Sequence, residues 1–155
     1  LQALTKSMAI PGIRLGYLFC PKEQDAKKVQ EQVSEWNVSV IAQRAGIAGM
    51  QVLADGTYLS QARQLLERER AYLTQSLQEI GAKVYPGTAN FLLFYEDSID
   101  WYAALLKQKI LIRDCSDYAG LSKGFYRIAI RRREENQVLV ETMQAVKKGE
   151  KVRWK

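Results

Sequence analysis

The sequence predicts an α/β fold in which a long helix joins two differently patterned parts. Apolar residues recur at helical spacing over residues 59–80, and the stripe ends at Gly81, which is typical of a left-handed helix cap. Beyond Gly81 the pattern changes to short apolar segments of strand character, separated by turn residues. We therefore expect four parts, at residues 1–58, 59–81 and 82–149, with a solvated tail at 150–155.

The part before the long helix is expected to hold one strand and two helices. Residues 14–20 alternate in polarity and stop at Pro21, which predicts a buried strand. Residues 22–36 carry apolar side chains at three- and four-residue steps, a spacing typical of a helix. Residues 40–53 are rich in alanine and glycine, so we predict a buried helix whose small residues let another surface approach closely.

The part after the long helix predicts a small sheet with two helices. A short helix is expected to begin at Asp97 or Ser98, either of which can cap it. A final helix is expected from Glu134 to Lys148, because its acidic start and basic end each carry the charge that the helix dipole favours. Strands are expected at residues 83–85, 90–95, 110–113 and 125–130.

Composition limits the chemistry that this chain can perform. Of its 155 residues 47% are apolar, which is enough to bury a core. The absence of histidine excludes Ser-His and Cys-His nucleophile pairs and most zinc sites, so no metal site is expected. The two cysteines, Cys20 and Cys115, lie far apart and fit a reducing compartment. No leader and no apolar run near about 18 residues is present, so we expect a cytoplasmic protein without a membrane span.

The net charge of +6 is concentrated in residues 101–155, which carry 13 lysines and arginines against six acidic residues. These cations are spread over strands, a helix end and the tail, and they form no single stripe interleaved with stacking aromatics. Nucleic acid is therefore not the expected partner, and a phosphorylated or carboxylated small substrate is the better class. A non-catalytic basic interaction module, in which these residues contact an acidic partner, is the alternative from another class.

The most informative chemical pattern lies in residues 4–17, where Lys6 precedes Arg14 by eight residues across a Pro11-Gly12 turn. A desolvated lysine can form a Schiff base with an aldehyde. A fixed guanidinium nearby can clamp a phosphate through paired hydrogen bonds. The alternatives are a surface lysine and an arginine paired with a core carboxylate.

This segment resembles the cofactor-lysine segment of the class I/II aminotransferase family, the pyridoxal-phosphate enzymes of fold type I. The resemblance implies that Lys6 holds pyridoxal 5′-phosphate and moves protons, while Thr5 and Arg14 bind the cofactor's phosphate. For Thr5, a local turn or cap role is the alternative. The resemblance also implies that residues 1–58 end the large cofactor-binding domain, 59–81 form the connecting helix, and 82–149 form the small C-terminal domain.

A second pattern places Arg113 and Arg127 on strands that are otherwise apolar, where a buried guanidinium must find an anion to offset its desolvation. Strand alternation puts Arg127 on the face of Phe125 and Ala129. Two arginines on neighbouring strands are candidates to clamp a substrate that carries both a carboxylate and a phosphate. The alternative is that they pair with acidic side chains, namely Asp114, Asp117 or Glu134.

Within the same family, this second stretch is similar to the threonine-phosphate decarboxylases of cobalamin biosynthesis, followed by the histidinol-phosphate aminotransferases. Both groups act on amino compounds that carry a phosphate ester, so the resemblance implies a phosphorylated small-molecule substrate bound by Arg113 and Arg127. Whether decarboxylation or transamination follows depends on which substrate bond stands perpendicular to the cofactor ring. The intact enzyme is implied to be a homodimer.

Some parts that the family needs are not found in this sequence. The acidic partner of the cofactor's ring nitrogen, the aromatic residue that stacks on the ring and the glycine-rich phosphate loop all precede the lysine segment in the family. We therefore expect the C-terminal part of a longer enzyme, which by itself binds the cofactor weakly and turns over no measurable substrate.

Overall fold

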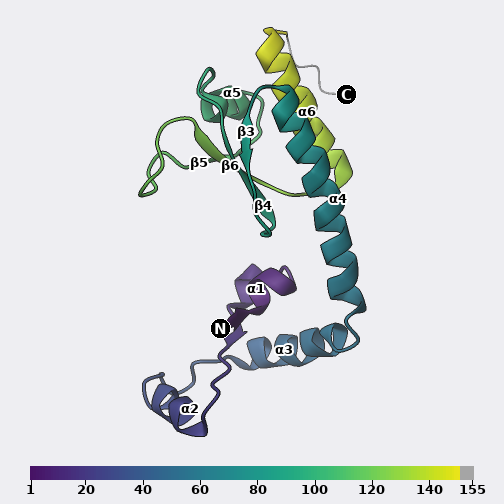
Figure 1. Cartoon of the computed structure of the whole chain (residues 1–155). Helices are drawn as coiled ribbons and strands as arrows, with labels where there is room; N and C mark the ends of the chain where they lie inside the picture. The colour runs from purple at the N-terminus through teal and green to yellow at the C-terminus, as the bar shows by residue number, and fades with distance from the viewer. Residues whose placement is uncertain (151–155) are drawn as a thin grey trace. The chain divides into compact units, whose positions relative to one another are not determined.

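The structure is a computed structural model in which residues 1–150 are described (Figure 1). The chain divides into two compact units, Leu1–Ala62 and Arg63–Lys155, and each is described by itself. Apart from Glu150, the expected tail at 150–155 lies outside the described residues. The boundaries expected at residues 58 and 81 stay a prediction.

The first unit is built from short elements around a small two-stranded sheet. Strands β1 and β2 are antiparallel, with Ala3 opposite Gly16. The backbone N–H of Leu4 donates to the carbonyl oxygen of Leu15 at 3.0 Å, which extends this pairing into the following helix. In chain order the elements are β1 (Gln2–Ala3), α1 (Leu4–Ser7), η1 (Pro11–Ile13), β2 (Gly16–Tyr17), α2 (Glu23–Gln30) and α3 (Val40–Leu53).

The predicted buried strand over residues 14–20 is wrong. Only Gly16 and Tyr17 are in a strand, and both are exposed, as is Phe19. Arg14 has a φ of 54°, in the left-handed region, so the extended backbone cannot begin before Leu15. Alternation of apolar residues predicted burial here, but the β1 partner is only two residues long.

The helix expected over residues 22–36 is shorter than predicted. Helix α2 ends at Gln30, and all of its residues are exposed. Trp36 has a φ of 60°, which no right-handed helix contains, and its side chain is 95% exposed. The apolar spacing of this segment therefore does not correspond to a buried helical face in the described structure.

Helix α3 has the predicted bounds, and Ser39 caps it by accepting a hydrogen bond from Ala42 N at 3.2 Å. The expectation that the helix is buried holds for one face only. Its small residues, Ala42, Gly46 and Gly49, are buried, whereas Ile47 on the other face is exposed. A Cβ at Gly46 would lie 2.6 Å from Leu15 Cδ2, so the expected close approach at the small residues is confirmed.

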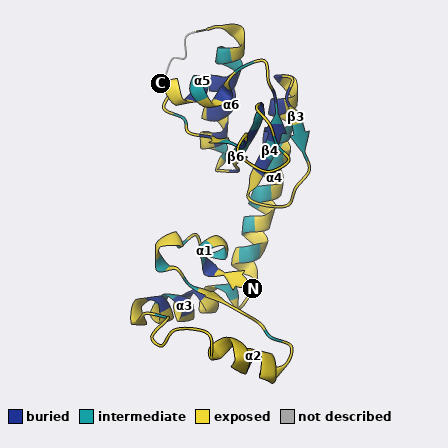
Figure 2. Ribbon diagram, turned by 90° about the vertical axis from the view of Figure 1, so that its left-hand side faces the viewer, coloured by how far each residue is buried: buried dark blue, intermediate teal, exposed yellow. Residues whose placement is uncertain are grey.

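The second unit is a four-stranded antiparallel sheet in the order β3-β4-β6-β5, packed against helices. Its core combines one sheet face with helical residues, represented by Phe94, Tyr126, Leu77, Trp101 and Met143. In Figure 2 the dark blue, buried parts of this unit lie along its strands and helices. The elements are α4 (Thr57–Glu79, which begins in the first unit), β3 (Lys83–Tyr85), β4 (Phe91–Tyr95), α5 (Trp101–Lys107), β5 (Arg113–Asp114), β6 (Phe125–Ala129) and α6 (Arg133–Lys148).

Most elements of this unit match their predictions within a few residues. The long helix α4 has 23 residues, and Gly81 beyond it has a φ of 88°, so the left-handed cap is confirmed. Gly149 closes α6 in the same way, with a φ of 70°. Strand β5 is the exception, because only Arg113 and Asp114 pair with β6.

The cap of α5 differs from the prediction. Asp100 caps this helix, since its Oδ1 accepts a hydrogen bond from Ala103 N at 3.0 Å. The two expected caps are used elsewhere: Asp97 accepts a hydrogen bond from the hydroxyl of Tyr95 at 2.6 Å, and the hydroxyl of Ser98 bonds to Glu96. Both candidates therefore belong to the loop before the helix.

Candidate active site

Lys6 lies in the short helix α1, whose position is set by its first residue. Leu4 is buried, and its backbone joins the helix to β2 through the Leu15 carbonyl. Two residues further on, the Lys6 side chain is exposed in the described structure, not desolvated as the sequence pattern predicts, and Thr5 beside it is half-buried. The amine of Lys6 forms no ion pair with any described residue.

Arg14 follows the 3₁₀ turn Pro11–Ile13 and directly precedes Leu15, the residue that accepts the Leu4 hydrogen bond. Lys6 and Arg14 are thus each within two residues of the same backbone hydrogen bond. The Arg14 side chain is exposed, and no carboxylate among residues 1–150 lies within ion-pair distance of it. The alternative of a core carboxylate partner for Arg14 is not realised in the described structure.

Gly16 makes the approach of the two segments possible. A Cβ at this position would lie 2.6 Å from the backbone oxygen of Gln2 on the paired strand. This is shorter than the distance at which a non-bonded carbon and oxygen pack in proteins. A side chain here would separate β1 from β2. Glycine is therefore required where the strand that precedes the lysine passes the strand that follows the arginine.

In the second unit, Arg113 and Arg127 are opposite each other across the β5–β6 ladder. Alternation places Arg127 on the same sheet face as Phe125, while Tyr126 and Ile128 point into the core, as predicted. The two guanidinium groups therefore stand on one face of the sheet, the face opposite its helix-packed core. Like charges directly opposite in a ladder repel, so each needs compensation nearby.

The environment of Arg113 differs from the prediction. Its side chain is 48% exposed, so it does not carry the full desolvation that a buried guanidinium would. Its Nη2 donates to Asp117 Oδ2 at 2.7 Å, so the alternative of an acidic partner is realised for this arginine. The guanidinium also lies over the ring of Tyr118, 5.3 Å from the centroid. The nearby charge of Asp117, followed by that of Tyr118, raises the pKa of Arg113 above its usual value.

Arg127 is half-buried and is compensated differently. Its guanidinium lies over the ring of Phe91, 4.9 Å from the centroid, on the neighbouring strand β4. Within residues 1–150 no carboxylate pairs with it. The acidic partners considered for it, Asp114, Asp117 and Glu134, are therefore not used by Arg127 in the described structure.

Two buried carboxylates were not singled out from the sequence. Glu69 in α4 and Glu96 after β4 are both buried and hydrogen-bonded. Glu96 accepts hydrogen bonds from Trp101 Nε1 at 2.6 Å and from Lys147 Nζ at 3.4 Å. Only the position of Glu69 within the apolar stripe of the long helix signals its burial in the sequence.

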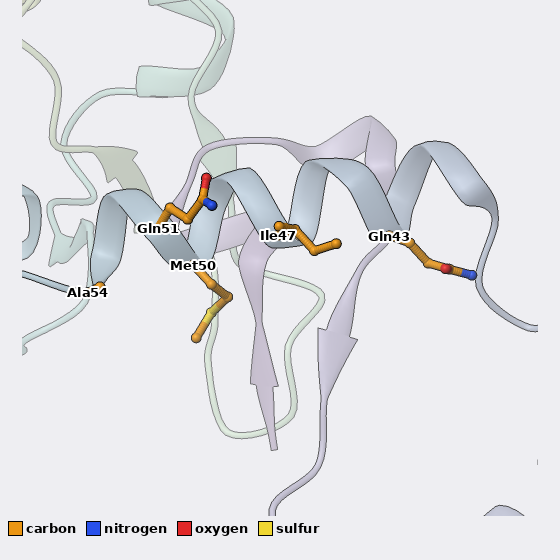
Figure 3. A pocket seen from close by; sticks show the side chains of 6 residues that line it. Gln43, Ile47, Met50, Gln51 and Ala54 are labelled. Carbon is orange, nitrogen blue, oxygen red and sulfur yellow. The ribbon is translucent and has the colours of Figure 1, made fainter.

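An open hollow of about 690 Å³ lies along helix α3, and none of the predicted site residues lines it. Figure 3 shows its side chains arranged along this single helix. Its lining is mostly apolar and consists of Gln43, Gly46, Ile47, Met50, Gln51 and Ala54.

Cys20 and Cys115 are both free thiols. Burial raises the pKa of the Cys115 thiol, which favours its protonated form. Residues 1–150 contain no group of three metal-ligating side chains, and none of their helices has the length and apolar character needed to span a bilayer.

Comparison with known proteins identifies relatives along nearly the whole chain. The chain is 37% identical over 152 residues to the threonine-phosphate decarboxylase of Salmonella typhimurium. This alignment covers 96% of this chain and 41% of that protein. It is 30% identical over 148 residues to a histidinol-phosphate aminotransferase of Nitratidesulfovibrio vulgaris, covering 94% of this chain and 38% of the relative. The chain thus spans about two fifths of the length of these relatives.

Solved structures confirm the expected fold class. The histidinol-phosphate aminotransferase from Clostridium acetobutylicum matches 95% of this chain and 45% of its own, with a TM-score of 0.85 and 30% identity. The L-threonine-O-3-phosphate decarboxylase from Porphyromonas gingivalis matches 93% of this chain and 45% of its own, with a TM-score of 0.77; at 22% identity this shows the fold alone. The fold is that of the α/β, fold-type I pyridoxal-phosphate enzymes.

The family assignment rests on nearly the full length of the sequence. The sequence model of the aminotransferase class I and II family matches residues 1–143 of this chain. Members of that family depend on pyridoxal 5′-phosphate, the cofactor that the sequence resemblance implies. This chain belongs to the class I and II aminotransferase family.

Proposed function

We propose that this chain is part of a pyridoxal-phosphate enzyme that acts on a phosphorylated amino compound, namely a threonine-phosphate decarboxylase. The single observation that carries this proposal is the pairing of Arg113 with Arg127 on one sheet face, in a chain 37% identical to such a decarboxylase. A histidinol-phosphate-type aminotransferase is the second candidate, because the C. acetobutylicum enzyme of that name has a TM-score of 0.85 to this chain.

The residues around α1 fit the cofactor. Lys6 supplies an exposed primary amine for the aldehyde, while Thr5 and Arg14 supply a hydroxyl and a guanidinium for the phosphate. When bound, the cofactor supplies an electron sink for the bonds at the substrate's α-carbon. Lys6 would hold the cofactor through its Nζ and would carry protons at the same atom. Arg14 orients the cofactor by holding its phosphate.

The paired arginines fit the substrate's two anionic ends. Arg127 has no carboxylate partner in the described residues and lies over the ring of Phe91, 4.9 Å from its centroid, which suits it to receive the substrate carboxylate. Arg113 stands beside it and receives the phosphate ester. Because both groups bind through charge-assisted hydrogen bonds, they orient the substrate as well as attract it.

The organisation of the whole enzyme follows from the same assignment. We assign residues 1–58 to the end of the large domain, 59–81 to the connecting helix and 82–149 to the small domain. The enzyme is a cytoplasmic homodimer. Sedimentation equilibrium of the whole protein that contains this chain tests the dimer, and a monomeric mass would contradict it.

Reduction with borohydride tests the cofactor site. The whole protein is loaded with pyridoxal 5′-phosphate, reduced, digested and mapped by mass spectrometry. We expect the label on Lys6 and none in Lys6→Ala, whose visible absorbance from bound cofactor is also lost. Lys28→Ala, which removes another exposed lysine of the same unit, keeps both signals. A label on any other lysine would contradict the assignment.

The reaction is decided by following threonine phosphate in the same preparation. A decarboxylase releases carbon dioxide and keeps the amine, whereas an aminotransferase forms a keto acid and leaves the carboxylate in place. We expect carbon dioxide. Transfer of the amino group from histidinol phosphate to an added 2-oxo acid, which leaves a phosphorylated ketone, would in its place favour the second candidate.

A further inference from the structure

The two cross-strand arginines differ in what holds them. Arg113 donates through Nη2 to Asp117, 2.7 Å away, and lies over the ring of Tyr118. Arg127 has an aromatic ring against it but no acid among the described residues. Arg113 therefore has two neighbours that hold it, a carboxylate bonded to Nη2 and an aromatic ring whose centroid lies 5.3 Å from the guanidinium carbon.

The loop between β5 and β6 brings both of these groups to Arg113. The backbone N–H of Ser116 donates to Asp114 Oδ1 at 2.9 Å, which forms a turn directly after β5. The N–H of Tyr118 then donates to the Cys115 carbonyl at 3.1 Å and closes the loop on itself. These bonds set the path of the backbone on either side of Asp117.

The start of this loop is also tied to the sheet. The N–H of Cys115 donates to the carbonyl of Phe125 in β6 at 2.9 Å, and Cys115 is buried. The two residues that hold Arg113 therefore belong to a loop anchored on the same strand that carries Arg127. Asp117, the fourth residue after Arg113, is therefore held near the guanidinium by the backbone of this loop.

A guanidinium has five N–H donors in a planar fork, and Asp117 occupies one corner of it through Nη2. The remaining donors are enough for a paired contact with a second oxyanion. A side chain of this kind loses less rotational freedom on binding if its plane is already fixed. A carboxylate bonded to one N–H of the guanidinium thus orients the remaining N–H donors for a ligand.

We propose that Asp117, with the ring of Tyr118, is a positioning residue that orients Arg113 for the phosphate ester of the substrate. The proposal rests on the proposed function and adds a residue to it. Asp117 does not touch the substrate, and it acts through the guanidinium that it holds. Its carboxylate also offsets the repulsion between Arg113 and Arg127 in the absence of substrate.

The test compares variants of the whole, cofactor-loaded protein that contains this chain. Binding of inorganic phosphate is measured by calorimetry, and kcat and KM are measured with threonine phosphate. We expect Asp117→Ala to weaken phosphate binding and raise KM about two- to five-fold, the range of an exposed ion pair, with kcat unchanged. Asp117→Asn keeps an oxygen acceptor and is expected to restore most of the loss.

Glu135→Ala is the matched control. It breaks another exposed pair of arginine and carboxylate four residues apart, between Arg131 and Glu135, and is expected to leave phosphate binding as in the wild type. Unchanged or tighter phosphate binding in Asp117→Ala would overturn the proposal. Tighter binding would mean that the Asp117 carboxylate competes with phosphate for Arg113 and does not position it.

Arg113→Ala separates this proposal from the proposed function. If Arg113→Ala weakens phosphate binding and Asp117→Ala does not, only the positioning role fails. If Arg113→Ala binds phosphate as the wild type does, the phosphate site assigned to Arg113 fails, and the role of Asp117 fails with it. A thermal melt of each variant confirms that the exposed substitutions leave the fold in place.

Discussion

Arg133, the first residue of α6, holds the buried carboxylate of Glu69 in the middle of α4. Its Nε lies 3.0 Å from Glu69 Oε2, and its Nη2 lies 3.0 Å from Oε1, so both oxygens are engaged. Asn136 donates to Oε2 as well, at 3.0 Å. The contact ties α4 to α6 through two residues that are 64 positions apart in sequence.

The same cluster reaches the strand that carries Arg127. The side chain of Asn136 accepts a hydrogen bond from Arg131 N at 3.1 Å and donates one to Arg131 O at 2.9 Å. Arg131 follows β6 by two residues. The buried carboxylate in α4 therefore helps to fix the end of the strand on which a proposed substrate arginine stands.

Removal of Glu69 is expected to destabilise the second unit strongly. Glu69→Ala leaves Arg133 and Asn136 without their shared acceptor, and breaking a buried pair costs about 3 kcal/mol. The free energy of unfolding of the 155-residue chain in urea measures this. Glu67→Ala, on the exposed side of the same helix, is the control and is expected to stay within about 0.5 kcal/mol of the wild type. A loss below about 1 kcal/mol in Glu69→Ala would contradict the role of the cluster.

Stability is expected to fall in acid because of Glu69 and Glu96. Burial favours the neutral form of each, but hydrogen bonds and nearby cations outweigh it and hold both pKa values below the usual 4.5. A carboxyl whose pKa is lowered by folding stabilises the protein above its unfolded pKa, and this contribution is lost as the pH falls through its folded pKa.

The free energy of unfolding is therefore expected to decrease below about pH 4.5, near the pKa of an unfolded glutamate. The measurement is a series of urea titrations from about pH 7 to pH 3. In Glu69→Gln the decrease is expected to be shallower, since one titrating group is gone. A variant as steep as the wild type would show that Glu69 does not take part.

Trp101 is expected to matter for stability where Trp36 does not. Trp101 is fully buried and donates from Nε1 to Glu96, whereas Trp36 is 95% exposed. Trp101→Phe leaves a buried carboxylate oxygen without this donor and is expected to cost about 1–3 kcal/mol. Trp36→Phe is the matched control, with a change within about 0.5 kcal/mol. Equal unfolding midpoints for the two variants would contradict the placement of Trp101.

Gly16→Ala is expected to impair the cofactor site without touching a group that binds the cofactor. The new Cβ would meet the backbone oxygen of Gln2 at 2.6 Å and push β1, and with it Lys6, away from β2. Overpacking of this kind costs about 1–3 kcal/mol, so we expect roughly tenfold weaker cofactor binding. Titration of the whole protein with pyridoxal 5′-phosphate measures it.

Gly87→Ala is the control for this substitution, since no atom lies within 4 Å of a Cβ built at Gly87 and its φ is not positive. Its titration curve is expected to match that of the wild type. Equal cofactor affinity in Gly16→Ala and Gly87→Ala would show that the β1–β2 approach is not needed to place Lys6.

Local pattern in the sequence determined the regular elements of the second unit. The stripe of α4, its stop at Gly81 and the alternation of β6 each depend on residues close together in the chain, and all three are confirmed. The sheet face of Arg127 follows from the same alternation, since side chains in a strand point to opposite faces in turn. The family was implied by the resemblance of the segments around Lys6 and Arg113 to known proteins, and the match over residues 1–143 confirms it.

Only the tertiary structure decided which groups pair and which are exposed. The exposed residues of α2 and β2 carry the apolar spacing that predicts burial, and burial depends on what packs against them. The choice of Asp117 among three candidate acids for Arg113, and the joining of Glu69 to Arg133, depend on loop geometry and on contacts between distant segments. The spacing of residues along the chain specifies which side chains share a face of one helix or strand. Which charged side chains pair depends on the distances between elements in the folded structure.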